Sequence, residues 1–432
     1  MDLGATSLRA ALGVWEGGRI RYEIRHQMPN LSVDDFWDLP AIEAFVRDSE
    51  ELAASEGASL GIDSWGVDVV IKSQGREASS RCYRHPAHQS EFDLWESSRR
   101  WLYDRTGIQA LPLNTVYQLL ALNREDPCLP EVATWSHVPD YLVAGLVGEI
   151  GFEGTMASTT QLMGLDGQWC FEVFEKIGWP VPSAQPVFGP SCVGMTSLGV
   201  PVVRVASHDT ASAVVALAPD GHDAFLNVGT WALLGQVLAS PLVSEAAYLG
   251  NWSNERAFDG RIRFLKNFPA FYLLNRVHDE LGVQGGVADW LAAGEPSGKT
   301  LDVLDKRLFA PGSMVSACSE ILGSQLTEAE WAGTLLDSIV LALSTGLSQL
   351  ETMTGQKVNT VHVGGGGAAS NSFCESLALV TGKTIRAAAQ EATVLGNLAC
   401  QFMARGCFHG DDLSVVCSAS TDSRFYHPVN RT

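Results

Sequence analysis

One stretch near the middle of the chain decides the fold, Ser207-His208-Asp209-Thr210-Ala211-Ser212-Ala213-Val214. Residues 200–206 before it are rich in valine and predict a buried strand, and residues 211–217 are small and apolar and predict a packed helix. Asp209 therefore stands where a strand ends and a helix begins, with its carboxylate near free backbone N–H groups. The simplest interpretation is a helix cap, but the hydrogen-bonding side chains on both sides of Asp209 favour a ligand site.

The two halves of the chain on either side of this stretch resemble each other. Residues 2–14 predict a strand, a tight turn with glycine and threonine, and a second strand, and residues 224–237 repeat that order around Gly229-Thr230. A chain of 432 residues is also longer than one core normally supports. We therefore expect an internal duplication and two domains. A carboxylate at their junction would face the cleft between them, where small ligands bind.

The composition excludes several classes of protein. A net charge of −20 argues against nucleic acid or an anionic membrane as partner. No segment approaches the ~20 unbroken apolar residues of a membrane helix, and Met1 is followed at once by Asp2, so no signal peptide is expected and the cytoplasm is the predicted location. The nine cysteines lack CxxC pairing, which predicts neither a zinc site nor a disulfide framework.

A glycine-rich loop follows a predicted strand in the second half. Residues 358–363 predict the strand, Gly364-Gly365-Gly366-Gly367 the loop and residues 371–381 a helix, an order that can bind an anion or a nucleotide. The loop also matches a dinucleotide pattern, but residues 384–387 lack the acidic residue expected at the next strand end. With the two Gly-Thr hairpins, the loop instead fits the binding of nucleotide phosphates.

Two carboxylates have natural roles in a phosphoryl transfer. Asp2, at the end of the first strand, would lie where a hydrated Mg²⁺ bridges the phosphates. Asp209 would receive the proton of the attacking hydroxyl. Phosphoryl transfer has a loose transition state, so positioning and charge neutralisation matter more than a strong base.

These motifs together resemble one known family. They are DLGATSLR (2–9), GIDSWGVDVV (61–70), VYQLLAL (116–122), VPDYL (138–142), STTQL (158–162), SHDTASAV (207–214), NVGTW (227–231), LKN (265–267), VGGG (363–366) and EATVLGN (391–397). The chain resembles the FGGY carbohydrate kinases of the actin/hexokinase superfamily, in order from Asp2 to about Gly406. Within the family the match is closest to the kinases of L-rhamnulose.

The resemblance implies a fold, an activity and cofactors. The expected fold is α/β, with two ribonuclease-H-like domains, residues 1–207 on the sugar and phosphate side and residues 208–432 on the nucleotide side, and an interdomain cleft. The expected activity is phosphorylation of a ketose by ATP with Mg²⁺, giving L-rhamnulose 1-phosphate as the first expectation. The expected partner is this small sugar, with no nucleic acid and no membrane, and the expected state is a monomer or homodimer.

The resemblance also implies roles for single residues. It makes Asp209 the catalytic base and assigns Asp2 to the metal and phosphates. The sugar-binding positions are Gly66, His208, Asp209, Thr210 and Asn267. The nucleotide-binding positions are Ala5, Thr6, Ser7, Leu8, Arg9, Thr230, Asn275 and Gly366. Asn275 stands where the family has a glutamine, which is one methylene longer.

Other functions remain open from the sequence alone. L-fuculose, ribulose or xylulose could replace L-rhamnulose, because stereochemistry depends on the loops around Gly66 and residues 155–161. A sugar-binding protein that keeps the fold without catalysis is a second possibility. A glycosidase with paired carboxylates such as Asp63 and Asp68 is a third.

The first strand departs from the family pattern. Family members carry several apolar residues before the first aspartate, whereas here only Met1 precedes Asp2. In this fold the strand lies inside a sheet, so its loss would leave neighbouring strands with unpaired backbone groups. We therefore expect the natural protein to begin upstream with a short apolar run.

Overall fold

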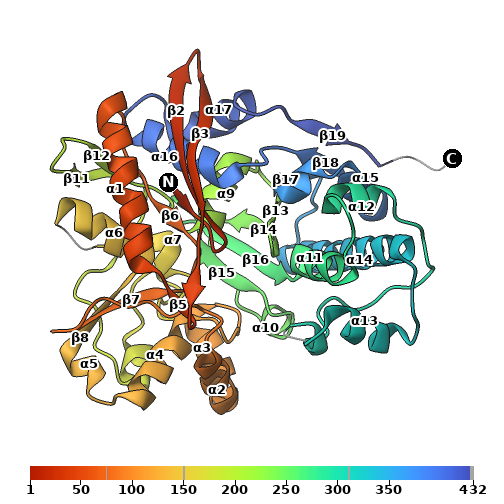
Figure 1. The fold of residues 1–432 in the computed structure, drawn as a ribbon, viewed down its shortest axis with the longest axis horizontal. Coiled ribbons are helices and arrows are strands. Elements are labelled where there is room, and N and C mark those ends of the chain that lie inside the picture. The colour runs from red at the N-terminus through yellow and green to blue at the C-terminus, as the bar shows by residue number, and fades with distance from the viewer. Residues whose placement is uncertain (74, 149–150, 310–311, 429–432) are drawn as a thin grey trace. The chain divides into compact units, whose positions relative to one another are not determined.

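The computed structural model describes residues 1–73, 75–148, 151–309 and 312–428. Its contacts divide the chain into two compact units, each of helices and strands, as expected for an α/β protein (Figure 1). Unit 1 consists of Met1–Ala218, Leu238–Phe264 and Thr393–Ser420. Unit 2 consists of Pro219–Val237, Leu265–Ala392 and Thr421–Thr432.

Unit 1 contains every described strand of the first half of the chain, together with β15 from the second half. They are β1 (Asp2–Leu3), β2 (Ser7–Glu16), β3 (Arg19–Pro29), β4 (Ser32–Val33), β5 (Phe36–Trp37), β6 (Asp63–Ser64), β7 (Val69–Ser73), β8 (Ala133–His137), β9 (Phe152–Glu153), β10 (Pro186–Val187), β11 (Ser191–Met195), β12 (Pro201–Arg204) and β15 (Ser253–Arg256). Its helices are α1 (Leu39–Glu56), α2 (Pro86–Leu94), η1 (Glu96–Ser98), α3 (Arg99–Thr106), α4 (Thr115–Glu125), α5 (Leu129–Val132), α6 (Val138–Val147), α7 (Gly154–Ala157), α8 (Phe171–Ile177), α9 (Asp209–Leu217), α10 (Glu245–Leu249), α16 (Ala392–Ala404), η4 (Gly410–Asp412) and α17 (Leu413–Ala419).

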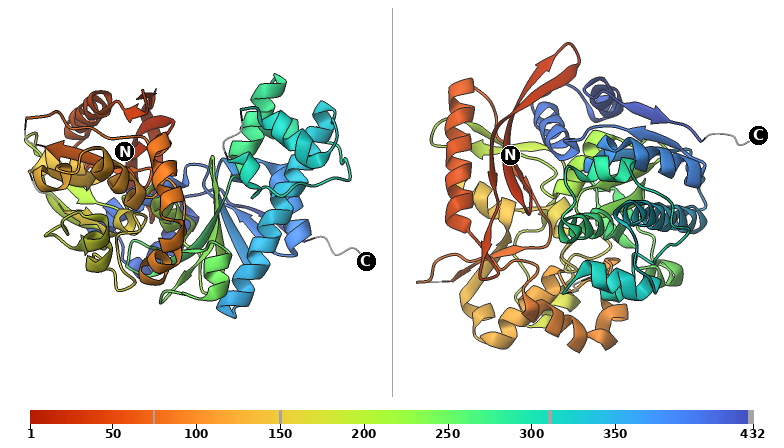
Figure 2. Two further views of the ribbon diagram at one scale, coloured as in Figure 1. Left: turned by 90° about the horizontal axis from the view of Figure 1, so that it is seen from below. Right: turned by 45° about the vertical axis from the view of Figure 1, so that its right-hand side comes forward.

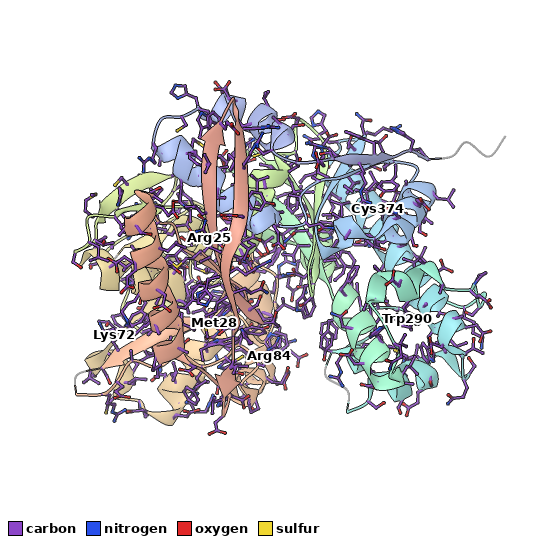
Figure 3. The ribbon with its side chains drawn as sticks, turned by 45° about the horizontal axis from the view of Figure 1, so that its top comes forward. Arg25, Met28, Lys72, Arg84, Trp290 and Cys374 are labelled. Atoms are coloured by element: carbon purple, nitrogen blue, oxygen red, sulfur yellow. The ribbon has the colours of Figure 1, made fainter. Side chains whose placement is uncertain are left out.

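The main sheet of unit 1 has the strand order β3-β2-β1-β6. β1 pairs antiparallel with β2 and parallel with β6, so this two-residue strand lies inside the sheet. Beyond β6, parallel bridges join Leu60 to Val202 and Ser64 to His208, which makes the segment around β12 the next neighbour. The β2–β3 hairpin stands beside α1 (Figure 1), and Arg25 and Met28 mark its second strand in Figure 3.

Helix α1 shows how the local sequence sets the bounds of an element. The Asp38 carboxylate accepts a hydrogen bond from Ala41 N at 3.0 Å, which caps the first turn. Ile42 and Phe45 lie at helical spacing and are buried. The helix ends at Gly57, whose φ of 62° is the left-handed conformation that glycine adopts without strain.

The units do not follow the expected boundary between residues 207 and 208. Residues 208–218, 238–264 and 393–420 group with the N-terminal part of the chain. The physical reason is packing, because α9 contacts β6 and α17, and α17 contacts β3. Unit 1 is therefore assembled from segments that lie far apart in the sequence.

Unit 2 is built on the same strand plan as unit 1. Its strands are β13 (Ala224–Val228), β14 (Ala232–Leu238), β16 (Ile262–Phe268, whose first half belongs to unit 1), β17 (Thr360–Gly365), β18 (Thr384–Ala387) and β19 (Arg424–Tyr426), in the order β16-β14-β13-β17-β18-β19. β13 pairs antiparallel with β14 and parallel with β17. Its helices are α11 (Ala270–Leu281), α12 (Val287–Ala292), η2 (Lys306–Leu308), α13 (Met314–Leu322), α14 (Glu328–Thr354), η3 (Gly366–Ala369) and α15 (Asn371–Thr381).

The long helix α14 is the core helix of unit 2. It starts with a capping box between Thr327 and Glu330 and ends at Gly355 in the left-handed conformation. By length and composition it could cross a membrane, but 61% of its most apolar window is buried in the protein. Trp290 of α12 lies among the helices of this unit (Figure 3), and its indole N–H donates to Glu328 O at the start of α14 at 3.1 Å. Figure 2 shows these helices from two further sides.

Candidate active site

Three segments of unit 1 end side by side at one edge of its sheet. β1 and β6 run parallel with Asp2 opposite Asp63. Ser64 N donates to Ser207 O at 2.8 Å, and Ser64 forms a parallel bridge with His208. Because the carboxyl ends of parallel strands meet at one edge, the turn after β1, the segment after β6 and the start of α9 are neighbours. The structure thus brings the predicted residues of unit 1 together.

Asp209 is the first residue of α9, one position inside the helix, and His208 occupies the cap position. Asp209 Oδ1 accepts hydrogen bonds from Thr210 N at 2.5 Å and Thr210 Oγ1 at 3.1 Å. Its side chain keeps 32% exposure, so a ligand can reach the carboxylate. Burial, and then the negative charge of Asp2, raise the pKa of Asp209 to about 7, against the lowering effect of the Thr210 bonds. A carboxylate with this pKa is suited to accept a proton near neutral pH.

Two further carboxylates lie close to Asp209. Asp2 is buried, and its Oδ2 accepts from Arg9 Nη2 at 2.5 Å. Asp63 is also buried, and Asn397 Nδ2 donates to its Oδ2 at 2.5 Å. Burial and the charge of Asp2 hold the pKa of Asp63 well above its usual range. The three carboxylates therefore repel one another, and a cation near them would relieve that repulsion.

This acidic group fits a magnesium ion that is carried mainly by substrate. Within the described ranges, no three His, Cys, Asp or Glu side chains are close enough to hold an ion by themselves. Mg²⁺ commonly keeps several waters and binds through one or two carboxylates together with substrate phosphates. Asp2 is the first residue of β1, not its last as the sequence predicted, and stands two residues before Gly4 of the β1–β2 turn, where it would bind an ion in that mode.

The turn between β1 and β2 is fixed by backbone hydrogen bonds. Gly4 N donates to Ser7 O at 2.9 Å, and Asn30 Nδ2 donates to Gly4 O at 2.9 Å. Thr6 is exposed and Ala5 half-buried at its tip, where both could meet a nucleotide. The side chain of Leu8 is 1% exposed and packs in the core, so only its backbone is available to a ligand.

The His208 ring packs closely against Gly66. A side-chain carbon at position 66 would lie 3.0 Å from His208 Nε2 and 3.2 Å from its Cδ2. The next residue, Val67, has a φ of 70°, which is rare for a β-branched residue and marks strain. Thr115 Oγ1 donates to Val67 O at 2.5 Å and helps to hold this conformation. The sugar side of the predicted site is therefore tightly packed.

The carboxylate of Asp68 stabilises the segment around Val67 through several hydrogen bonds. It accepts hydrogen bonds from Trp37 Nε1 at 2.6 Å, Trp65 Nε1 at 2.8 Å and Gln118 Nε2 at 2.9 Å. Burial raises the pKa of Asp68 to about 7, although these donors act in the opposite direction. Asp63 and Asp68 are at most 1% exposed, so they cannot flank a glycosidic bond as the glycosidase hypothesis required.

The other predicted residues belong to unit 2. Thr230 is exposed in the turn between β13 and β14, and its carbonyl accepts from Tyr272 N at 2.7 Å. Gly366 is exposed at the start of η3, directly after β17. Asn267 is half-buried in β16, and Asn275 is exposed on α11. Of these residues, Thr230 stands in the turn of unit 2 that corresponds in topology to the β1–β2 turn of unit 1.

The sequence interpretation missed two charged residues next to His208. Arg263 Nη2 lies 3.1 Å from His208 Nδ1 and 3.0 Å from Glu255 Oε2. Both residues are buried, on β16 and β15. The available signal was an arginine inside the apolar run Ile262-Arg263-Phe264-Leu265, since a charge in a buried strand needs a partner.

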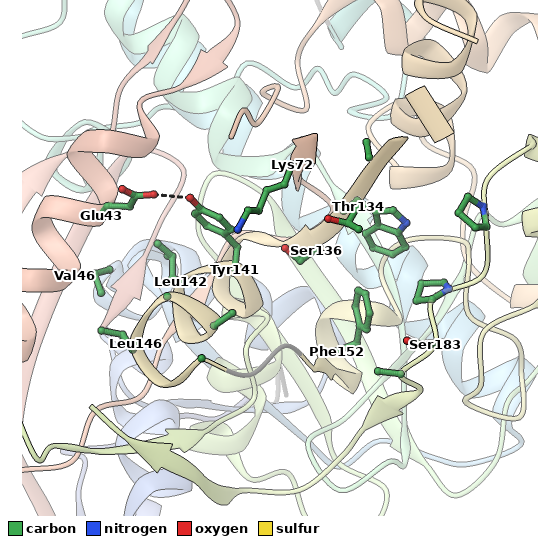
Figure 4. Close-up of a pocket in the computed structure, with 18 of the residues that line it drawn as sticks. Glu43, Val46, Lys72, Thr134, Ser136, Tyr141, Leu142, Leu146, Phe152 and Ser183 are labelled. Carbon is green, nitrogen blue, oxygen red and sulfur yellow. Dashed lines mark hydrogen bonds between the residues drawn. The ribbon is translucent and has the colours of Figure 1, made fainter. Parts of the chain in front are cut away.

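A separate cavity of unit 1 has a volume of about 990 Å³ (Figure 4). Residues of α1, β7, β8 and α6 and the segment 180–184 line it. The Tyr141 hydroxyl donates to Glu43 Oε1 at 2.7 Å, and the Lys72 ammonium lies 5.6 Å from the centre of the Tyr141 ring. The lining includes none of the residues predicted for the site.

Sequence comparison finds relatives over nearly the whole chain. The C-terminal domain of the FGGY family of carbohydrate kinases matches residues 224–405. The rhamnulokinase of Yersinia pestis bv. Antiqua (strain Angola) is 34% identical over 442 residues, which cover 94% of this chain and 90% of the relative. The rhamnulokinase of Mannheimia succiniciproducens is 33% identical over 435 residues, which cover 95% of this chain and 90% of the relative.

Solved structures of sugar kinases share the fold. A ligand-bound xylulose kinase from Lactobacillus acidophilus superposes with a TM-score of 0.80 at 16% identity, covering 99% of this chain and 93% of that one. The glycerol kinase of Plasmodium falciparum with ADP gives a TM-score of 0.77 at 13% identity, with coverage of 99% and 93%. The fold is thus the two-domain fold of these kinases, as the sequence predicted. Together with the relatives above, this shows that the chain belongs to the FGGY family of carbohydrate kinases and is a sugar kinase.

Proposed function

We propose that this enzyme transfers the γ-phosphoryl group of ATP to a ketose, with L-rhamnulose as substrate and L-rhamnulose 1-phosphate as product. The rhamnulokinase relatives support this choice of sugar. The observation that carries the chemistry is Asp209, a reachable carboxylate at a helix start whose pKa is raised to about 7. L-fuculose, ribulose and xylulose are the alternative substrates.

Asp209 acts as the general base in this proposal. It accepts the proton of the sugar hydroxyl as that oxygen attacks the phosphorus atom, and the leaving group is ADP. Gly66, His208, Thr210 and Asn267 contact the sugar. Because the transition state is loose, the base has to receive the proton late rather than generate a strong nucleophile.

The nucleotide contacts come from both hairpins and the glycine loop. In unit 1 they are Ala5, Thr6, Ser7, Arg9 and the backbone of Leu8, and in unit 2 they are Thr230, Asn275 and Gly366. Asp2 would hold Mg²⁺, which would supply positive charge against the phosphate charge that develops during transfer. We further propose that the enzyme works in the cytoplasm, as a monomer or homodimer and without nucleic acid or membrane as partner.

The test is a panel of ketoses with ATP and Mg²⁺ in an assay that couples ADP release to a detectable product. L-rhamnulose should give the highest kcat/KM, and Asp209→Asn is the matched control that keeps the shape of the site. Higher kcat/KM with another ketose would replace the substrate. Sugar binding without ADP release by the wild type, measured by calorimetry, would show a binding protein and contradict the proposal.

A further inference from the structure

A buried ion pair lies behind the sugar side of the site. Arg263 is 0% exposed, and its Nη2 donates to Glu255 Oε2 at 3.0 Å. Its Nε donates to Arg256 O at 2.9 Å. Burying two charges is expensive, and a buried pair is often no more stable than apolar residues of the same volume. A gain in stability therefore does not explain this ion pair, and none of the residue roles proposed above involves it.

The arginine also reaches the histidine of the site. Arg263 Nη2 lies 3.1 Å from His208 Nδ1. A guanidinium has only donors, so Nδ1 must be the acceptor and cannot carry a proton. Burial, and then the positive charge of Arg263, hold the pKa of His208 well below its usual range, so the ring is neutral. Its single proton is consequently on Nε2.

The Nε2 atom faces the reacting side of the site. It lies 3.4 Å from Asp209 Oδ1, which already accepts two hydrogen bonds from Thr210. The same atom would lie 3.0 Å from a side-chain carbon at position 66, and glycine has no such carbon to cover it. The Nε2–H group therefore has room to donate to a ligand beside the Asp209 carboxylate.

We propose that Arg263 is a positioning residue that fixes His208 as the Nε2–H tautomer, so that His208 donates a hydrogen bond to the same sugar hydroxyl whose proton Asp209 accepts. This inference rests on the proposed function for the identity of the ligand. The ligand group must accept a hydrogen bond from Nε2–H and donate one to a carboxylate. A hydroxyl does both, whereas an ammonium group cannot accept and an ether cannot donate.

Glu255 explains why an arginine is needed at this place. Its Oε2 lies 3.5 Å from His208 Nδ1, close enough to attract a proton onto that nitrogen. Without Arg263, Glu255 would become the partner of an Nδ1–H group, and the ring would take the other tautomer or a second proton. Arg263 neutralises Glu255 and occupies Nδ1 at the same time.

The experiment is ¹⁵N NMR of the full chain with labelled histidine, without ATP or sugar, with His208→Gln to assign the signals. In the wild type, His208 should show an unprotonated Nδ1 and a protonated Nε2. In Arg263→Met, Nδ1 should become protonated, and kcat/KM for the sugar should fall roughly 10- to 100-fold, the value of a hydrogen bond lost from a charged site. Glu255→Gln keeps the arginine and should keep the wild-type tautomer.

Three results would overturn the inference. They are a wild-type His208 protonated on Nδ1, an Arg263→Met variant that keeps Nε2–H, and one that changes tautomer but keeps its kcat/KM. If circular dichroism shows Arg263→Met to be unfolded, Arg263→Lys replaces it, because lysine also donates only and should restore the Nε2–H tautomer and turnover. A wild type that phosphorylates no ketose contradicts the proposed function instead, because the tautomer is read without turnover.

Discussion

The hairpins β1–β2 and β13–β14 have the same topology but different charge. In each, the first strand pairs antiparallel with the second and parallel with a later strand, β6 or β17. Two residues before the glycine of each turn stands Asp2 in the first hairpin and Asn227 in the second. The two side chains have nearly the same shape, but only Asp2 carries a negative charge.

The surroundings of the two hairpins also differ in charge. Beside β1 lie Asp63 and Asp209, whose pKa values are raised by the charge of Asp2 as well as by burial. Beside β13 lies the glycine loop, where Gly365 packs against Val228 O. One hairpin is therefore surrounded by carboxylates and the other by backbone. Under the proposed function, proton and metal chemistry would belong to unit 1, and neutral backbone contacts to unit 2.

Removing the base from the charged side should have the largest effect. Asp209→Asn should lower turnover by roughly 10²- to 10⁴-fold, the usual value of a positioned general base, while sugar and ATP affinity stay within a few-fold. Single-turnover rates and calorimetric affinities measure the two quantities separately. Turnover close to wild type would show that Asp209 is not the base.

Exchanging the charge between the hairpins tests the comparison itself. Asp2→Asn should raise the Mg²⁺ concentration for half-maximal activity by roughly 10- to 100-fold, because a carboxylate at the metal is lost. Asn227→Asp, the matched change in the other hairpin, should leave that concentration nearly unchanged. If both variants shift it equally, the division of chemistry between the hairpins is wrong.

The pH profile gives a second measure of Asp2. In the wild type, activity should rise as pH increases through about 7, because Asp209 acts as a carboxylate and is protonated below its pKa. The charge of Asp2 raises the pKa of Asp209, so Asp2→Asn should move the rise to lower pH. A rise that stays in place would mean that another group controls it.

Alanine substitutions compare the backbone of two glycines in unit 2. Gly365→Ala should reduce the free energy of unfolding by about 1–3 kcal/mol, because φ is 72° and the new carbon would lie 2.5 Å from Val228 O. Gly229→Ala, with no atom within 4 Å of the new carbon, should change it by less than about 0.5 kcal/mol. Urea unfolding measures both, and equal losses would contradict the packing described here.

The smallest effect is expected at Asn275 on α11. Asn275→Gln adds the methylene that the family has at this position and should lower KM for ATP a few-fold while kcat is unchanged. Asn275→Ala serves as the control and should raise KM for ATP. If neither substitution changes KM, Asn275 does not contact the nucleotide.

The sequence predicted the elements whose pattern is local. The strand and helix around Asp209 and the helix over residues 371–381 are confirmed, because apolar spacing and capping residues lie within a few positions of one another. Helix α2 was not predicted, because its polar sequence has no apolar stripe that would mark a buried face.

The parts of the site that depend on distant partners could not be predicted. Asp68 is held by Trp37 and Gln118, which lie 31 and 50 residues away in the sequence. His208 meets Arg263 across 55 residues. Nothing in the local pattern shows which buried charges will meet, so the contact of His208 with Arg263 was not predicted.

The assembly of unit 1 from distant segments has a consequence for synthesis. Asn397 Nδ2 donates to Met1 O, Gly61 O and Asp63 Oδ2, and Gly396 packs so closely that a carbon there would lie 1.7 Å from Ser212 O. The ribosome makes the first 218 residues long before these late partners exist. The surface that residues 393–420 cover, against which Leu395 and Leu398 are buried, therefore stays open until they emerge, and exposed apolar surface of this kind favours aggregation.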